Sequence, residues 1–185
     1  MSWSIGEIGA LAIKAARGAG MDWGMAQEVG WAVRWLCRSG HDPSGALVER
    51  LEEPDIAACP FSIGLRCCES GQFSVATECP VQHSLLSLPF IARIVPDGIE
   101  WHLSMGGAEA RLQRQHVVLS GATPRTADFS YHGATPARVP VIRARIPNPD
   151  PETLSRLQMF AGRIYAPSTP ESRRLGAGAG LNDSD

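Results

Sequence analysis

The hydrophobic pattern of this chain changes its period near residue 54, and this change limits the fold more than any other feature. Up to Glu53, apolar residues recur at spacings of three and four, which indicates amphipathic helices. From Cys59 onward, short apolar runs are separated by glycine and proline, which is typical of strands and turns. Because the two patterns occupy separate stretches, we expect an α+β fold.

The helical part, residues 1–53, is expected to form a helical hairpin followed by a short helix. The capping box Ser4-Ile5-Gly6-Glu7 predicts a first helix that ends near Arg17. Asp22 is the expected N-cap of a second helix over residues 23–39, which Gly40 ends. A third helix is expected from Ser44 to Glu53. The buried face of the second helix is expected to consist of Ala26, Val29, Val33 and Leu36.

Glycines interrupt both helices of the expected hairpin. Gly6 and Gly9 fall in the first helix, and Gly24 and Gly30 in the second. Each costs about 1 kcal/mol of helix propensity relative to alanine. A close approach of the two helices would recover that cost.

The β-rich part, residues 59–146, is expected to form a central, mainly antiparallel sheet. The clearest signal is a hairpin of Phe90–Val95 and Ile99–Met105, joined by Pro96-Asp97-Gly98. In a last strand, Pro140 indicates an edge position. The further strands are expected over Val117–Leu119, Phe129–Tyr131 and Val139–Ile146.

The C-terminal part, residues 150–185, begins with a helix that Asp150 caps and Pro151 opens. A tail of alternating glycine and alanine follows after Leu175. The length of 185 residues suits one core, so we expect a single globular domain over residues 1–185. The apolar stripe of the C-terminal helix is expected to be Leu154, Leu157, Phe160 and Ile164.

Composition and charge exclude several classes of protein. The net charge of −2 provides no general attraction to nucleic acid, and no apolar run reaches the ~20 residues of a membrane span. Residues 1–14 lack the pattern of a secretory signal, and five cysteines are best explained as reduced thiols, so a cytoplasmic protein is expected. Neither a dinucleotide fingerprint nor a Walker lysine is present, and no cofactor is expected.

The basic residues are almost all arginines. Lys14 is the only lysine, and ten of the sixteen arginines lie after residue 110. Codon usage of a GC-rich genome explains this bias most simply. The functional alternative is that some guanidinium groups hold carboxylates or phosphates in a bidentate manner, which places an anion site toward the C-terminal half.

Metal and cysteine chemistry are the next hypotheses. Cys67 and Cys68 would point to opposite faces of a strand, and the C-x-x-C spacing of zinc sites is absent. No histidine is tied to a cysteine by a nucleophile signature. Structural thiols are therefore favoured over a metal site, and His41-Asp42 is interpreted as a helix cap. The residues weighed for metal binding are Cys59, Cys67, Cys68, Cys79 and His83.

Two functions from different classes fit these patterns. The first is a small-molecule enzyme or binding protein whose arginine-lined pocket holds an anionic metabolite and is closed by the C-terminal segment. The second is a non-catalytic accessory subunit that docks on a partner enzyme or forms a homodimer through helix 23–39, which carries Trp23, Trp31 and Trp35. The expected pocket residues are Arg17, Glu28, Arg34, Glu171, Ser172, Arg173 and Asp183.

Several short motifs are spread along the chain: Ala16-Arg17-Gly18-Ala19-Gly20, Trp23-Gly24 with Glu28, Arg34-Trp35-Leu36, Cys59-Pro60, Leu88-Pro89-Phe90, and the ending from Tyr165-Ala166-Pro167 through Asp183. With these motifs the chain resembles the bacterial proteins grouped as DUF3726, a family of unknown function. The resemblance implies no reaction. It does imply that the glycine-rich end belongs to the domain.

Overall fold

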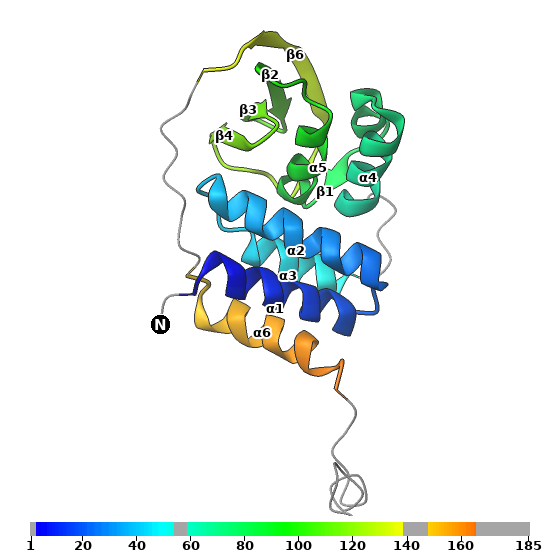
Figure 1. Cartoon of the computed structure of the whole chain (residues 1–185), viewed down its shortest axis with the longest axis vertical. Coiled ribbons are helices and arrows are strands. Elements are labelled where there is room, and N and C mark those ends of the chain that lie inside the picture. The colour runs from blue at the N-terminus through cyan, green and yellow to red at the C-terminus, as the bar shows by residue number, and fades with distance from the viewer. Residues whose placement is uncertain (1–2, 54–58, 139–147, 166–185) are drawn as a thin grey trace, which may run out of the picture.

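The computed structural model describes residues 3–53, 59–138 and 148–165 and has an α+β fold (Figure 1). Its N-terminal part confirms the expected helices as α1 (Ile5–Gly18), α2 (Trp23–Arg38) and α3 (Ser44–Glu52). The capping box is formed, since the Ser4 hydroxyl accepts a hydrogen bond from the Glu7 amide. Asp22 caps α2 in the same way through the amide of Met25. These side chains satisfy amides that the first helical turn leaves without partners.

Glycines set the distances between neighbouring helices. A Cβ on Gly30 would lie 3.0 Å from the carbonyl oxygen of Gly9, so these two glycines allow α1 and α2 to approach closely. Gly18 has the same role toward α6 (Pro151–Gly162), which packs on the other side of α1 (Figure 1). Gly6 and Gly24 face no neighbouring helix. Close approach therefore explains two of the four glycines of the hairpin.

The stretch that follows corrects the sequence prediction, because residues 60–93 are mainly helical. Helix α4 (Pro60–Ser70) and helix α5 (Leu88–Arg93) replace the expected strands, including Phe90–Val95. Pro60 and Pro89 lie in first helical turns, where a missing amide hydrogen costs nothing. Gly71, with φ 67°, ends α4 in the left-handed conformation. The remaining short elements are η1 (Phe73–Thr77), β1 (Val81–Gln82) and η2 (Ser84–Ser87).

A four-stranded antiparallel sheet has the strand order β4-β3-β2-β6. Strand β2 pairs with β3 through Gly106 and Gly107, whose positive φ angles suit a tight hairpin. The expected hairpin of Phe90–Val95 with Ile99–Met105 is therefore wrong in its first strand, and residues 139–146 lie outside the described residues. The strands are β2 (Ile99–Met105), β3 (Ala108–Gln113), β4 (His116–Ser120), β5 (Thr126–Ala127), which pairs with β1, and β6 (Phe129–Pro136).

The core lies between the helices and one face of this sheet. Leu103 and Met105 of β2 are fully buried on that face. Trp35 of α2 is also buried and donates from its indole nitrogen to the carbonyl of Arg114 at 3.3 Å. Trp31 packs edge-on against Phe90, with ring centroids 5.7 Å apart. Trp31 and Trp35 therefore connect α2 to α5 and to the turn between β3 and β4.

The C-terminal helix begins as the sequence predicts. The Asp150 carboxylate accepts from the amide of Thr153 at 2.9 Å. Leu157 and Phe160 are buried against α1, whereas Ile164 lies exposed beyond the end of the helix. The glycine-rich tail lies outside the described residues.

Candidate functional site

The three site residues expected in the helical part have different neighbours. Arg17 donates to the carbonyl of Met21 in the turn after α1. Arg34 of α2 covers Gly9 of α1. Gly9 lies eight residues before Arg17 on the same helix, which corresponds to about 12 Å along the helix axis. Glu28 pairs with Arg93 of α5 at 2.6 Å. The structure therefore places Arg17, Glu28 and Arg34 in separate contacts between elements.

The four expected residues of the tail cannot be placed. Glu171, Ser172, Arg173 and Asp183 lie outside the described residues. Their role in closing a pocket stays a prediction.

A pocket of about 520 Å³ opens at the ends of β2, β3 and β6. Its polar lining comes from side chains that are separated by up to 38 positions in the sequence. They are Glu100, His102, Arg111, Thr135 and Arg138.

The strand geometry explains why these side chains meet. Successive side chains of a strand alternate between its two faces, so Glu100 and His102 lie opposite to the buried Leu103. The antiparallel register places Thr135 of β6 directly beside Glu100. A bulge in β6, where Gly133 has φ 143°, shifts the register between His102 and Leu103.

Glu100 is the buried centre of this pocket, with only 4% of its surface exposed. The side-chain amide of Gln113 donates to Oε2 of Glu100 at 2.8 Å and to the carbonyl of Arg138 at 3.0 Å. The second carboxylate oxygen, Oε1, lies 3.7 Å from Nε2 of His102 and 3.9 Å from Nη1 of Arg111. Both distances exceed that of a hydrogen bond, so Oε1 can still accept one from a bound molecule.

The other groups complete a polar surface of mixed charge. His102 Nε2 lies 2.9 Å from the Thr135 hydroxyl. Arg111 and Arg138 both have exposed side chains. The guanidinium groups of Arg111 and Arg138 carry two positive charges, and the Glu100 carboxylate carries one negative charge. Guanidinium groups that water can reach suit the bidentate binding of carboxylate or phosphate.

His116 of β4 pairs with Gln113 of β3, the residue whose side-chain amide donates to Glu100. The polar residues around Glu100 therefore continue onto β4. Burial lowers the pKa of His116, and the charge of Glu100 opposes that shift. Nε2 of His116 is buried without a hydrogen-bond partner. The surroundings of His116 therefore favour its neutral form, and the charge of Glu100 works against this preference.

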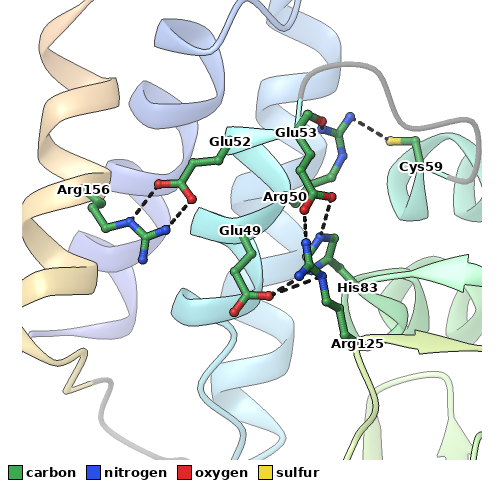
Figure 2. A network of polar contacts seen from close by, with 8 residues as sticks. All are labelled: Glu49, Arg50, Glu52, Glu53, Cys59, His83, Arg125 and Arg156. Carbon is green, nitrogen blue, oxygen red and sulfur yellow. Dashed lines mark hydrogen bonds and ion pairs between the residues drawn. The ribbon is translucent and has the colours of Figure 1, made fainter.

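A second polar cluster joins α3 to the loop after β4 (Figure 2). His83 is 2% exposed, and its ring nitrogens lie 3.6 Å from Glu49 and 3.5 Å from Glu53. Arg125 forms ion pairs with the same two carboxylates. A pocket of about 270 Å³ lies beside His83, but its arginine already has these partners. This cluster is therefore a weaker candidate for anion binding.

A neighbouring ion pair of α3 connects that helix to α6. Arg156 donates from Nε to Glu52 at 2.8 Å and forms a second hydrogen bond to the same carboxylate (Figure 2). The acidic side chains at and just after the end of α3 therefore contact three residues that come later in the chain, namely His83, Arg125 and Arg156.

The cysteines are free thiols with different surroundings. Cys67 and Cys68 lie on helix α4, so their expected placement on a strand is wrong. Burial raises the pKa of Cys67 to about 11, and it also raises the pKa of Cys68, whose thiol donates to the carbonyl of Phe90. Within residues 3–53, 59–138 and 148–165, no three histidine, cysteine or acidic side chains gather as metal ligands would.

Sequence reasoning missed Glu100, His102, Arg111 and Arg138. One signal pointed toward them: the alternation of apolar and polar residues from Ile99 to Met105 puts Glu100 and His102 on one face. The pocket arginines both follow residue 110, in the half of the chain that the arginine distribution indicated.

Fold and pocket together define a small α+β protein with a polar pocket of mixed charge at one end of an antiparallel sheet. Residues 3–80 match the family model described as a protein of unknown function, DUF3726. This match confirms, for the N-terminal part of the chain, the family that the motifs indicated; Leu88-Pro89-Phe90 and the ending lie beyond it. No curated protein and no solved structure matches the chain. Of the described helices, none has both the length and the apolar composition to cross a bilayer.

Proposed function

We propose that the pocket around Glu100 binds a small anionic metabolite with a carboxylate or phosphate group. The observation that carries this proposal is the placement of Arg111 and Arg138 at the rim of a pocket whose floor is a buried carboxylate. The arginines hold the anionic group of the ligand, since planar guanidinium groups match its oxygens. A hydroxyl or amino group of the same ligand donates to Oε1 of Glu100.

The same groups would support catalysis as well as binding. Glu100 and His102 can each accept or release a proton within the pocket, which is the role of a general acid or base. The C-terminal segment with Glu171, Ser172, Arg173 and Asp183 is proposed to close over the ligand. We place this activity in the cytoplasm, where the five cysteines would stay reduced.

The proposal is tested by a thermal-shift screen of carboxylate and phosphate metabolites on the full chain. A ligand at a hundred times its Kd stabilises the folded state by about 2.7 kcal/mol, which raises Tm by roughly 5–10 °C for a chain of this size. We expect Arg111→Gln and Arg138→Gln to reduce that shift strongly. Arg66→Gln is the matched control, because Arg66 is an exposed arginine of α4 that pairs with Glu78 outside the pocket.

Equal shifts in the control and in both pocket variants would refute this location. Loss of the shift in Arg17→Gln or Arg34→Gln, but not in the pocket variants, would instead favour the helical lining expected from the sequence. A chain truncated after Leu175 tests the tail separately: its shift should fall if the segment closes the site.

The alternative of docking through helix 23–39 has less support from the geometry. Trp31 and Trp35 contact other parts of the same chain, and Trp23, 61% exposed, is the ring of that helix with the largest exposed fraction. A single exposed ring is common on protein surfaces.

A further inference from the structure

Helix α3 buries an arginine whose charge has no acidic partner among the described residues. Arg50 is 6% exposed. Its Nη1 donates to the backbone carbonyl of Glu53 at 2.5 Å, and its Nη2 donates to Sγ of Cys59 at 3.3 Å (Figure 2). Its Nε is buried without a hydrogen-bond partner. Within the parts of the chain that the structure describes, no carboxylate lies within 4.0 Å of this guanidinium.

A buried guanidinium without a counter-charge is costly, because the protein interior solvates charge poorly. Among the residues that the structure describes, the ionisable group that touches Arg50 is the thiol of Cys59. Its thiolate would place a negative charge directly beside the Arg50 guanidinium. The pairing of a deeply buried cation with this sulfur therefore distinguishes Cys59 from an ordinary partly buried cysteine.

The position of Cys59 at a helix terminus adds a second stabilising contact. Cys59 is the N-cap of α4, an eleven-residue helix, and the nearby backbone amide of Ser62 contributes to lowering the pKa of its thiol. Helix N-termini favour negative charge and thereby stabilise thiolates.

We propose that Cys59 is a thiolate held by Arg50, and that it is a site of oxidation by hydrogen peroxide. The sulfur attacks one peroxide oxygen, the S–O bond forms and the O–O bond breaks. Sulfur is oxidised to a sulfenic acid, which keeps one peroxide oxygen as its hydroxyl group. The other peroxide oxygen leaves as hydroxide, so the peroxide is reduced. The Arg50 guanidinium stabilises the negative charge on the departing oxygen. This proposal is independent of the anion pocket.

Cys68 on the same helix provides an internal comparison. An arginine, Arg93, also lies beside its sulfur, but that arginine is already paired with Glu28. Burial raises the pKa of Cys68, and the charge of Arg93 does not offset it. At Cys59, burial acts in the same direction, but the amide of Ser62 and the guanidinium of Arg50 together outweigh it and lower the pKa. Within the described part of the chain, the two sites therefore differ in the neighbouring arginine: Arg93 has a carboxylate partner, whereas Arg50 has none.

The first experiment measures alkylation of the full, reduced chain by iodoacetamide as a function of pH. Peptide mass spectrometry gives a separate rate for each cysteine. At pH 7 we expect Cys59 to react at least about tenfold faster than Cys68, because the thiolate is the nucleophile. The rate of Cys59 should reach half its plateau at a lower pH than that of Cys68. Equal or reversed rates and midpoints would overturn the proposal.

The second experiment treats the chain with hydrogen peroxide and captures sulfenic acid with dimedone. We expect label on Cys59 at peroxide concentrations that leave Cys68 unlabelled. Arg50→Gln, checked for folding by circular dichroism, should slow labelling of Cys59 by about tenfold, and Arg50→Lys should recover part of the rate. Labelling unaffected by Arg50→Gln would refute the role of the arginine. If Arg50→Gln does not fold, the comparison of Cys59 with Cys68 in the unmodified chain still decides.

Discussion

The contact between α1 and α6 depends on Gly18, and replacing this residue by alanine tests the helix packing directly. A Cβ built on Gly18 would overlap the carbonyl oxygen of Phe160 and lie 2.7 Å from its carbonyl carbon. Both atoms belong to the backbone of α6, so no change of side-chain rotamer can remove the overlap. Helix α6 would have to move away from α1.

The expected change in stability combines terms of opposite sign. Overpacking of such a contact costs about 1–3 kcal/mol. Moving α6 also exposes part of Leu157 and Phe160, whose complete burial contributes about 1.5–3 kcal/mol each. Alanine recovers about 1 kcal/mol through its higher helix propensity. We therefore expect Gly18→Ala to lower the free energy of unfolding by about 2–4 kcal/mol.

The assay is urea and thermal unfolding of Gly18→Ala beside Gly6→Ala. Gly6 is an exposed residue of the same helix, and the atom nearest to its built Cβ is the Ser4 hydroxyl oxygen at 3.8 Å. Gly6→Ala should raise stability by up to about 1 kcal/mol. For Gly18→Ala, Tm should fall by roughly 5–15 °C. If Gly18→Ala proved as stable as Gly6→Ala, the close packing of α6 on α1 would be refuted.

Two further predictions concern ionisable groups. Burial lowers the pKa of His83 in the folded protein, although the charge of Glu49 opposes this shift. His83 therefore stabilises the folded state at pH values above the ordinary histidine pKa of about 6.5. This stability is lost as the pH falls from that value toward the lower pKa of the folded state. His83→Asn, which tolerates φ 47°, should flatten the fall of Tm between about pH 7 and 5; an unchanged slope would contradict this. Glu28→Gln should cost at most about 1 kcal/mol in urea unfolding, because its ion pair is one-third exposed, and should leave any ligand-induced shift intact. A lost shift would place Glu28 in the ligand site.

The N-terminal helices could be predicted because their limits are set by local chemistry. The Ser4 and Asp22 side chains each cap an amide only three residues away, so the interaction is visible as a short spacing in the sequence. The same holds for Asp150 at the start of α6. Helices with such side-chain caps were correctly located.

Residues 60–93 could not be predicted in the same way, because proline and glycine occur both at helix ends and in turns between strands. Pro60 begins a helix, and Gly71 ends it, yet each residue also marks turns between strands. The deciding interaction is distant: Gly64 lets α4 pack on Phe90, since a Cβ there would lie 2.6 Å from that of Phe90. The true hairpin signal, Gly106-Gly107, joins β2 to β3.

The candidate pocket depends on register, which the sequence does not display. Glu100 is buried because Gln113 and Thr135 lie beside it on two other strands. The bulge near Gly133 then decides which residues of β6 reach this face. A local pattern could mark Glu100 as a polar residue on a strand, but only the pairing of three strands makes it the floor of a pocket.

The position of the family match separates the two proposals. The matched residues 3–80 contain Arg50 and Cys59, whereas the polar residues of the sheet pocket begin at Glu100. A function that depends only on the matched residues 3–80 would have to use side chains of those residues. The Arg50–Cys59 pair is one such set of side chains. The pocket would then provide a ligand site outside the matched part. Because the two sites use different residues on different elements, each can fail without the other.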